Sequence, residues 1–240
     1  TAEVLRPSDR YFAATRLGLC GCDKTLDALI RATYELTTDE LFDRITRRKA
    51  IEALGRRKDI RAIPALVDVL ACSDTEAVIN AISALIRIGW SPSPGEHDRL
   101  LHLLDSEDVT LSRAVIQAFT RLSIKSSASR SCIGELCDHE SALVSGAARA
   151  CLSKLYGEKG LMQPLLTQLT DLVAGKRRSA VIDIGDSGDH GLLTALVKAP
   201  VSMSLRAKSF LQIVNTGDLS RVELYQELFK RLLVDDPLLL

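Results

Sequence analysis

A helical hairpin repeated down the chain is the sequence feature that most limits how it can fold. The clearest copy, RRKAIEALGRRKDIRAIPALVDVL, occupies residues 47–70. Degraded copies align on the last apolar residue of each first helix, at intervals of roughly 29 to 37 residues. These anchors are Leu17, Leu54, Ile88, Leu122, Leu155, Ile184 and Ile213. One such hairpin cannot bury its apolar stripe alone, so neighbouring copies must stack. We therefore predict an all-α fold, an α-solenoid (superhelix) of about six to seven HEAT-like helical hairpins.

Glycine and aspartate recur at fixed places in several of these copies. A glycine directly after the anchor predicts a C-cap for the first helix, and an aspartate shortly afterwards predicts an N-cap for the second helix. The glycines are Gly18, Gly55, Gly89 and Gly185. The aspartates are Asp23, Asp59, Asp189 and Asp218.

Composition and charge exclude several classes of protein. Hydrophobic residues make up 46% of the chain, which is enough for a long core. Lysine and arginine number 31 and aspartate and glutamate also 31, so the net charge is zero. Binding to nucleic acid depends on neutralising phosphates, so we expect no nucleic-acid partner. No apolar run is long enough to cross a bilayer, and we expect a cytoplasmic protein without a membrane partner.

We expect residues 1–240 to form a single HEAT-repeat domain. The chain starts at Thr1 without methionine and ends in the apolar stretch DDPLLL, which would be an odd cap for a solenoid. We therefore also expect the sequence to be trimmed from a longer chain.

The sequence lacks a recognisable metal or nucleotide motif. Cys132, Cys137 and His139 could supply three metal ligands, but no fourth follows nearby. HExxH, P-loop and GxSxG patterns are missing from the sequence. We accordingly expect no metal site and no permanent cofactor.

Five of the second helices each carry one polar residue that is flanked by mostly apolar residues. Helical periodicity places this residue opposite the buried stripe, so all five should lie on one surface. They are Arg31, Asp68, His102, Glu135 and Gln168. Because the second helices of HEAT-type solenoids usually line the concave side, we expect that surface to be concave. The first helices have their own outward column of Arg16, Arg87, Arg121, Lys154, Asp183 and Gln212. The alternative is that both columns are merely solvated.

Two further features interrupt the repeat. A dense basic cluster follows an insertion at residues 35–45, and it could bind carboxylates or phosphates or simply form solvated helix ends. Its members are Arg44, Arg47, Arg48, Lys49, Arg56, Arg57 and Lys58. Trp90, the only tryptophan, follows a helix end beside a proline-rich turn. It could cap the core or offer an indole wall to a planar ligand.

Six segments of the chain carry a resemblance to a known family. They are RYFAATRLG at 10–18, ITRRKAIEALGRRKD at 45–59, AVINAISALIRIGW at 77–90, VIQAFTRL at 115–122, AGKRRSAVIDIGDSGD at 174–189 and APVSMSLRAKS at 199–209. Together they resemble the E/F-type, HEAT-repeat phycobilin lyases of cyanobacteria, most of all the members that serve phycoerythrins as lyases or lyase-isomerases. The resemblance spans nearly the whole chain. It implies attachment of an open-chain tetrapyrrole through a thioether to a cysteine of an apo-phycobiliprotein, with phycoerythrobilin as the expected bilin. A lyase-isomerase would also convert phycoerythrobilin into phycourobilin.

That chemistry assigns roles to particular residues. Proton delivery needs a general acid, for which Asp68, His102 and Glu135 are the catalytic candidates. Cations would bind the bilin propionates, a carboxylate could pair with the pyrrole nitrogens, and an aromatic ring could cover the bilin. The bilin-binding candidates are Arg31, Arg47, Arg48, Trp90 and Asp183.

The expected partners are the phycobilin as substrate, the apo-phycobiliprotein subunit and a second lyase subunit. The competing interpretation is a non-enzymatic HEAT-repeat adaptor or chaperone for phycobiliproteins, since most helical repeat arrays only bind.

Overall fold

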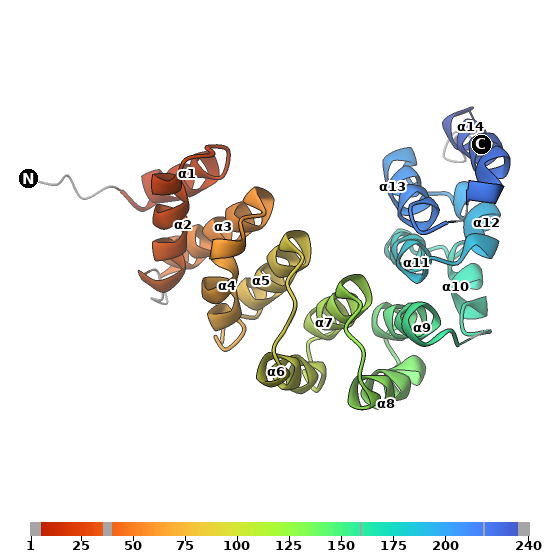
Figure 1. Ribbon diagram of the computed structural model, residues 1–240, viewed down its shortest axis with the longest axis horizontal. Coiled ribbons are helices and arrows are strands. Elements are labelled where there is room, and N and C mark those ends of the chain that lie inside the picture. Colours follow the sequence, from red (N-terminus) through yellow and green to blue (C-terminus); the bar gives the residue numbers. More distant parts are fainter. Residues whose placement is uncertain (1–5, 36–39, 159, 218, 235–240) are drawn as a thin grey trace, which may run out of the picture. The chain divides into compact units, whose positions relative to one another are not determined.

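The computed structural model describes residues 6–35, 40–158, 160–217 and 219–234. It divides into two compact units, residues 1–106 and 107–240. Within the described residues every regular element is helical, and the helices form hairpin after hairpin (Figure 1). The predicted all-α fold of stacked HEAT-like hairpins is therefore confirmed. None of the described helices combines the length and apolar character needed to cross a membrane.

The first unit contains three hairpins. They are α1 (Pro7–Leu17) with α2 (Asp23–Glu35), α3 (Leu41–Arg57) with η1 (Ile60–Ala62) and α4 (Ile63–Val69), and α5 (Thr75–Ile88) with α6 (Pro94–Leu104). The first helices pack in succession, α1 on α3 and α3 on α5, while α2 packs on α4. The side chains of Leu54, Leu66 and Leu85 are completely buried between these layers.

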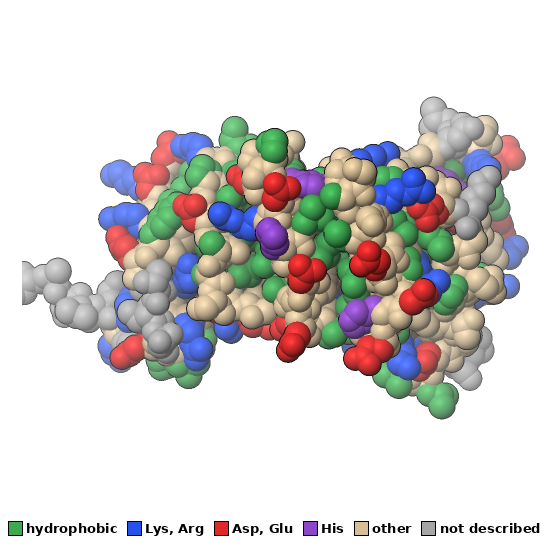
Figure 2. Space-filling view, turned by 90° about the horizontal axis from the view of Figure 1, so that it is seen from below, with side chains coloured by type: hydrophobic (Ala, Val, Ile, Leu, Met, Phe, Trp, Pro, Cys, Tyr) green, Lys and Arg blue, Asp and Glu red, His purple; other side chains and the backbone are tan. Residues whose placement is uncertain are grey.

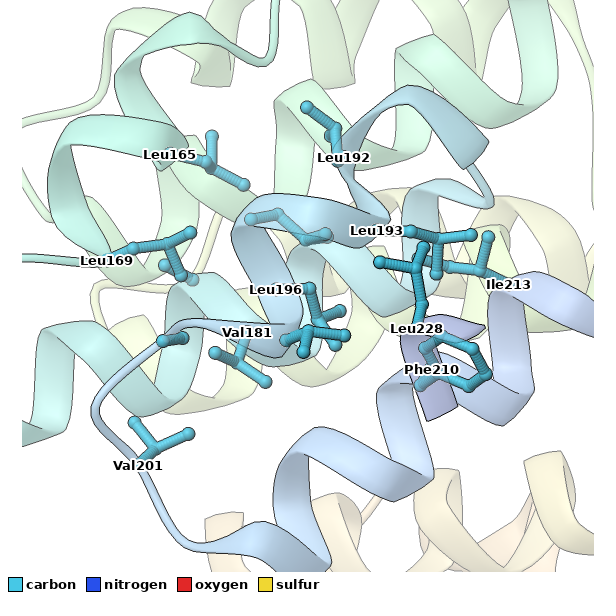
Figure 3. Close-up of a cluster of buried hydrophobic side chains, with 14 of the residues drawn as sticks. Leu165, Leu169, Val181, Leu192, Leu193, Leu196, Val201, Phe210, Ile213 and Leu228 are labelled. Carbon is cyan, nitrogen blue, oxygen red and sulfur yellow. The ribbon is translucent and has the colours of Figure 1, made fainter. Parts of the chain in front are cut away.

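The described residues of the second unit form four hairpins. They are α7 (Val109–Leu122) with α8 (Ser127–Glu135) and η2 (Leu136–Asp138), α9 (Ala142–Tyr156) with α10 (Gln163–Gln168), α11 (Ala174–Ser187) with η3 (His190–Leu192) and α12 (Leu193–Val197), and α13 (Met203–Val214) with η4 (Leu219–Arg221) and α14 (Val222–Val234). Leucine, valine and aromatic side chains from α10 to α14 form a continuous core (Figure 3).

The curvature of the second unit differs from our expectation. Helices α7, α9, α11 and α13 pack closely in succession, and α7 also contacts α11 across α9. They follow the inside of this unit's curve, while α8, α10, α12 and α14 lie outside it (Figure 1). We call α7, α9, α11 and α13 the inner layer. The prediction that second helices line the concave side is wrong for this unit, because the first helices approach one another more closely.

Small residues at the contacts between first helices permit close packing in each unit. A Cβ added to Gly55 would lie 2.7 Å from Ala84, and one added to Gly185 would lie 2.8 Å from the Cβ of Ser209. Both glycines are inside helices, so they permit close helix packing and do not act as C-caps. Of the predicted caps, Gly89 alone has the left-handed φ, 82°, since Gly18 is right-handed.

The predicted aspartate caps are confirmed at two of the four positions. Asp59 accepts a hydrogen bond from the backbone N–H of Arg61, and Asp189 accepts one from Gly191. Asp23 is instead the first residue of α2, where it pairs with Arg61. The remaining candidate, Asp218, lies outside the described residues.

Candidate functional site

The polar column of the second helices is exposed, as its spacing predicts. Arg31, Asp68 and His102 lie on α2, α4 and α6 of the first unit, and Glu135 lies on α8 of the second. Gln168 on α10 is only half-exposed. Figure 2 shows a face on which acidic, basic and histidine side chains are intermixed with hydrophobic ones. Charge alone therefore does not mark a site on that face.

Two of these exposed residues have identifiable surroundings in the first unit. The carboxylate of Asp68 accepts a hydrogen bond from the hydroxyl of Tyr34 at 3.0 Å, which ties α4 to α2. Arg31 lines a small cavity of about 230 Å³ between α1 and α2, together with Arg10 and Glu35. Neither arrangement brings a catalytic candidate against a bilin-binding candidate.

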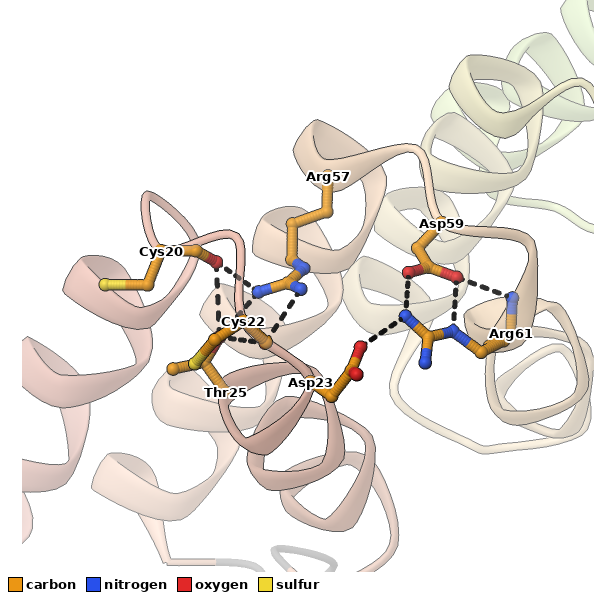
Figure 4. A network of polar contacts seen from close by, with 7 residues as sticks. All are labelled: Cys20, Cys22, Asp23, Thr25, Arg57, Asp59 and Arg61. Atoms are coloured by element: carbon orange, nitrogen blue, oxygen red, sulfur yellow. Dashed lines mark hydrogen bonds and ion pairs between the residues drawn. The ribbon is translucent and has the colours of Figure 1, made fainter.

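The predicted basic cluster holds the first unit together. Arg47 donates to the carbonyl of Thr33 at 2.9 Å, and Arg48 forms a two-point contact with Asp74 at 2.9 and 2.5 Å. Arg57 donates to the carbonyls of the turn between α1 and α2 (Figure 4). The guanidinium groups of Arg47 and Arg48 thus have structural partners in this conformation.

The single tryptophan also belongs to the core. Trp90 is 4% exposed, directly after the C-cap of α5, and its backbone N–H bonds to the carbonyl of Leu85. The core-capping alternative describes its position, because the buried indole leaves no face to cover a ligand.

The inner layer of the second unit contains the most unusual polar group of the described residues. Asp183 on α11 is 0% exposed, although its spacing assigned it to an outward column. That assignment is wrong, since α7 covers this face of α11. Arg113 of α7 donates to both carboxylate oxygens of Asp183, at 3.1 and 2.6 Å, and to the carbonyl of Leu143 at 2.6 Å.

A second ion pair joins the same two helices. Arg121, two turns after Arg113 on α7, donates to the two oxygens of Asp186 at 2.8 and 2.9 Å. The side-chain amide of Gln212 on α13 also donates to Asp186. Asp186 is 2% exposed, so both carboxylates are buried and both guanidinium groups are held in fixed orientations.

Gly146 on α9 makes room for the first of these pairs. A Cβ added there would lie 2.8 Å from Oδ2 of Asp183 and 4.0 Å from Oε1 of Gln168. The missing side chain allows Asp183 and Gln168 to approach the bare backbone of α9. Gln168 is thus the member of the second-helix column that the structure places beside Asp183.

Burial changes the ionisation of groups in this layer. It raises the pKa of Asp183 to about 7, outweighing the opposing attraction of Arg113. It also lowers the pKa of Lys154, which lies near Asp186 and Arg121. A carboxyl group with a pKa near neutrality exchanges protons at working pH, which is the behaviour found at many functional sites.

A cavity of about 260 Å³ lies beside the two ion pairs, and we call it the inner-layer cavity. It is lined from α7, α11 and α13 by Arg113, Gln117, Arg121, Ile182, Leu205, Lys208, Ser209 and Gln212. The residues recur three or four positions apart on α7 and α13, so each helix presents one face to it. Cations, amides and two apolar side chains therefore converge on one space.

Comparison with known proteins places the chain in a family. A family model for HEAT repeats matches residues 5–87 and 34–120. The bilin biosynthesis protein PecE of Mastigocladus laminosus is 30% identical over 224 residues, which is 89% of this chain and 79% of that protein. PecE of a Nostoc species is 30% identical over 215 residues, 85% of this chain and 80% of that one. The chain belongs to the E/F-type family of HEAT-repeat phycobilin lyases.

Two further proteins extend the comparison. The uncharacterized phycocyanin operon protein Y of Pseudanabaena tenuis is 28% identical over 239 residues, 98% of this chain. The present chain spans only 56% of that protein's length. The structure of the complex of CpcE and CpcF of phycocyanin lyase from a Nostoc species has the same fold, with a TM-score of 0.77 at 22% identity over 97% of this chain and 91% of the matched one.

Sequence reasoning about this lyase-family chain missed Arg113, Asp186 and Lys208. A signal was available in VIDIGD, where Asp183 and Asp186 interrupt an apolar run three residues apart, on one face of a helix. Two carboxylates on a face that must be buried require cationic partners. The arginines that pair with these two aspartates come from α7, which reaches past α9. A local sequence pattern cannot predict that contact between distant helices.

Proposed function

We propose that this chain is a phycobilin lyase, which joins an open-chain tetrapyrrole through a thioether to a cysteine of an apo-phycobiliprotein subunit. The observation that carries the proposal is the 30% identity to PecE, a bilin biosynthesis protein, along 89% of the chain. We further propose phycoerythrobilin as the bilin and a phycoerythrin subunit as the acceptor, because segments such as VIDIGDSGD and APVSMSLRAKS resemble those of lyases of that kind. Isomerisation to phycourobilin would be an additional step.

The attacking sulfur in this reaction belongs to the acceptor protein. Its S–H adds across the exocyclic double bond of ring A, so that a C–S bond forms, the proton goes to the neighbouring ring carbon, and nothing leaves. The lyase does not need a nucleophile of its own. Burial raises the pKa of the Cys151 thiol to about 11 and also raises that of Cys137, which makes both poor nucleophiles.

The protein's contribution is then to hold a flexible bilin with ring A facing one thiol. Such positioning is worth about 7–11 kcal/mol in well-oriented reactions. Asp68, His102 and Glu135 remain the proposed proton donors, and their exposure on the second helices would let them meet a docked acceptor. The bilin is a substrate in this scheme, and no permanent cofactor is invoked.

We propose a second lyase subunit as an additional partner. The support is that CpcE and CpcF of phycocyanin lyase form a complex, and this chain has the fold seen there.

The test is coproduction of the chain with a phycoerythrobilin pathway and an apo-phycoerythrin subunit, with and without the second subunit. Covalent product is detected by zinc-induced fluorescence after denaturing electrophoresis, and its absorbance identifies the bilin. The matched control is an acceptor subunit whose bilin-binding cysteine is replaced by alanine.

A coloured acceptor that depends on both the chain and the acceptor cysteine would support the lyase. Absorbance at the phycourobilin band would add isomerisation. A colourless acceptor that still copurifies with the chain in every arm would refute the lyase and favour the adaptor or chaperone.

A further inference from the structure

Among the described residues that line the inner-layer cavity, one cation lacks a carboxylate partner. Arg113 is matched by Asp183 and Arg121 by Asp186. Lys208 of α13 lines the same cavity, is exposed, and has no ion-pair partner among the residues that the structure describes. The cavity therefore attracts an anion, and protonation of Asp183 near neutral pH would strengthen that attraction.

The donors around this cavity are already oriented. The guanidinium of Arg121 uses Nε and one Nη on Asp186, is 30% exposed, and lines the cavity beside Lys208. An arginine has five N–H donors, so Arg121 retains donors after this contact. Because Asp186, itself held by Gln212, fixes the plane of the Arg121 guanidinium, an anion that enters loses little free energy to side-chain ordering.

Size and apolar lining narrow the class of ligand. Pockets that enclose a whole drug-sized molecule measure about 300–1,000 Å³. The inner-layer cavity, at about 260 Å³, is too small to enclose an open-chain tetrapyrrole. Ile182 and Leu205 line part of it and would contact methylene groups. These features suit a carboxylate carried on a short aliphatic arm.

We propose that the inner-layer cavity binds a propionate arm of the bilin, with Lys208 and Arg121 contacting its carboxylate and Ile182 and Leu205 contacting its methylenes. The identity of the arm rests on the proposed function, since a bilin carries two propionates. The bulk of the tetrapyrrole then lies outside the cavity.

The test measures binding without any acceptor protein or covalent step. The purified chain is titrated with biliverdin, an open-chain tetrapyrrole diacid, and separately with biliverdin dimethyl ester, and the visible absorbance and circular dichroism of the bilin are followed. The same titrations are made with Lys208→Gln and with Lys230→Gln. Lys230 is an exposed lysine on α14 that lies outside the cavity lining and serves as the matched control.

We expect the wild type to bind the diacid about tenfold more tightly than the diester, the effect of one charge-assisted contact. Lys208→Gln should abolish most of this preference, and Lys230→Gln should retain it. Equal affinities for diacid and diester, no binding of either, or an unchanged preference in Lys208→Gln would overturn the proposal. Since no attachment is measured, these results are independent of whether the coproduction experiment yields a coloured acceptor.

Discussion

Two carboxylate–guanidinium pairs in this protein have similar geometry and opposite ionisation behaviour. In the first unit, Arg61 contacts both oxygens of Asp59 at 3.0 and 2.7 Å (Figure 4). In the second, Arg113 contacts both oxygens of Asp183 at 3.1 and 2.6 Å. The hydrogen bonds from Arg61 lower the pKa of Asp59 to about 2, whereas burial raises that of Asp183 to about 7.

Exposure to solvent decides whether such a pair lowers or raises the pKa of its aspartate. The side chain of Arg61 is 54% exposed, so water screens the pair and it serves mainly to secure the start of η1. The side chain of Asp183 is 1% exposed, and the free energy lost by removing its carboxylate from water exceeds the free energy gained from contact with Arg113. The same two residue types therefore make a local cap in one unit and a buried pair whose aspartate has a raised pKa in the other.

Breaking the buried pair should have the largest effect. Arg113→Ala leaves the carboxylate of Asp183 buried without its main partner, and we expect the free energy of unfolding to fall by about 3–5 kcal/mol. Denaturant titration monitored by circular dichroism measures it. The comparison variant Arg61→Ala should change the midpoint only slightly, because its partner stays hydrated. Equal losses in the two variants would show that burial does not separate the pairs.

Filling the space beside Asp183 should have the next largest effect. In Gly146→Ala the new methyl group would lie 2.8 Å from Oδ2 of Asp183, so the ion pair or α9 must move. We expect a loss of about 1–3 kcal/mol in the free energy of unfolding, typical of overpacking. Gly134→Ala on α8 is the control, since its Cβ would have no heavy atom within 4 Å. It should be neutral or stabilising, because alanine favours helix. A stable Gly146→Ala protein would mean that this contact is not tight.

The pH dependence of stability should show the two pairs acting in opposite directions. An aspartate in an unfolded chain has a pKa of about 3.9. Asp183, beside Arg113, Asp186 and Arg121, binds its proton more tightly when folded, so its contribution to stability should fall as pH rises from about 4 to about 7. Asp59 binds its proton less tightly when folded, so its contribution should be lost as pH falls from about 4 to about 2.

Denaturant midpoints measured between pH 4.5 and 7.5 separate these effects. Subtracting the curve of Asp183→Asn from that of the wild type should leave a stability that declines with rising pH in this window. A flat difference would mean that Asp183 is ionised throughout. Asp59→Asn should leave the slope in this window unchanged.

Much of the fold could be predicted from the sequence because the repeat is a local pattern. The anchors Leu54, Ile88 and Leu122 all lie at or near the ends of first helices, where their spacing put them. The C-cap prediction for the recurring glycine is confirmed at Gly18 and Gly89 and wrong at Gly55 and Gly185, which lie inside helices. A C-cap and a close helix contact both favour glycine, and only the neighbouring helix, such as α5 with Ala84 facing Gly55, distinguishes them.

The candidate site was less predictable because it depends on helices far apart in the sequence. Asp183 was assigned to the outward column of the first helices, but it is buried because α7 reaches past α9 to contact α11. Gly146, which leaves room for Asp183 against α9, looks like any helix-interior glycine in the sequence. The sequence could not single out Lys208, because its place in the cavity lining depends on how α7 and α13 are arranged.

The most direct test of the account measures covalent attachment in the coproduction assay for the wild type, Lys208→Gln and Lys230→Gln. If the inner layer of the second unit positions the bilin through a propionate, Lys208→Gln should form coloured acceptor about tenfold more slowly, while Lys230→Gln matches the wild type. Equal rates for all three proteins would contradict a role for the inner-layer cavity in the reaction.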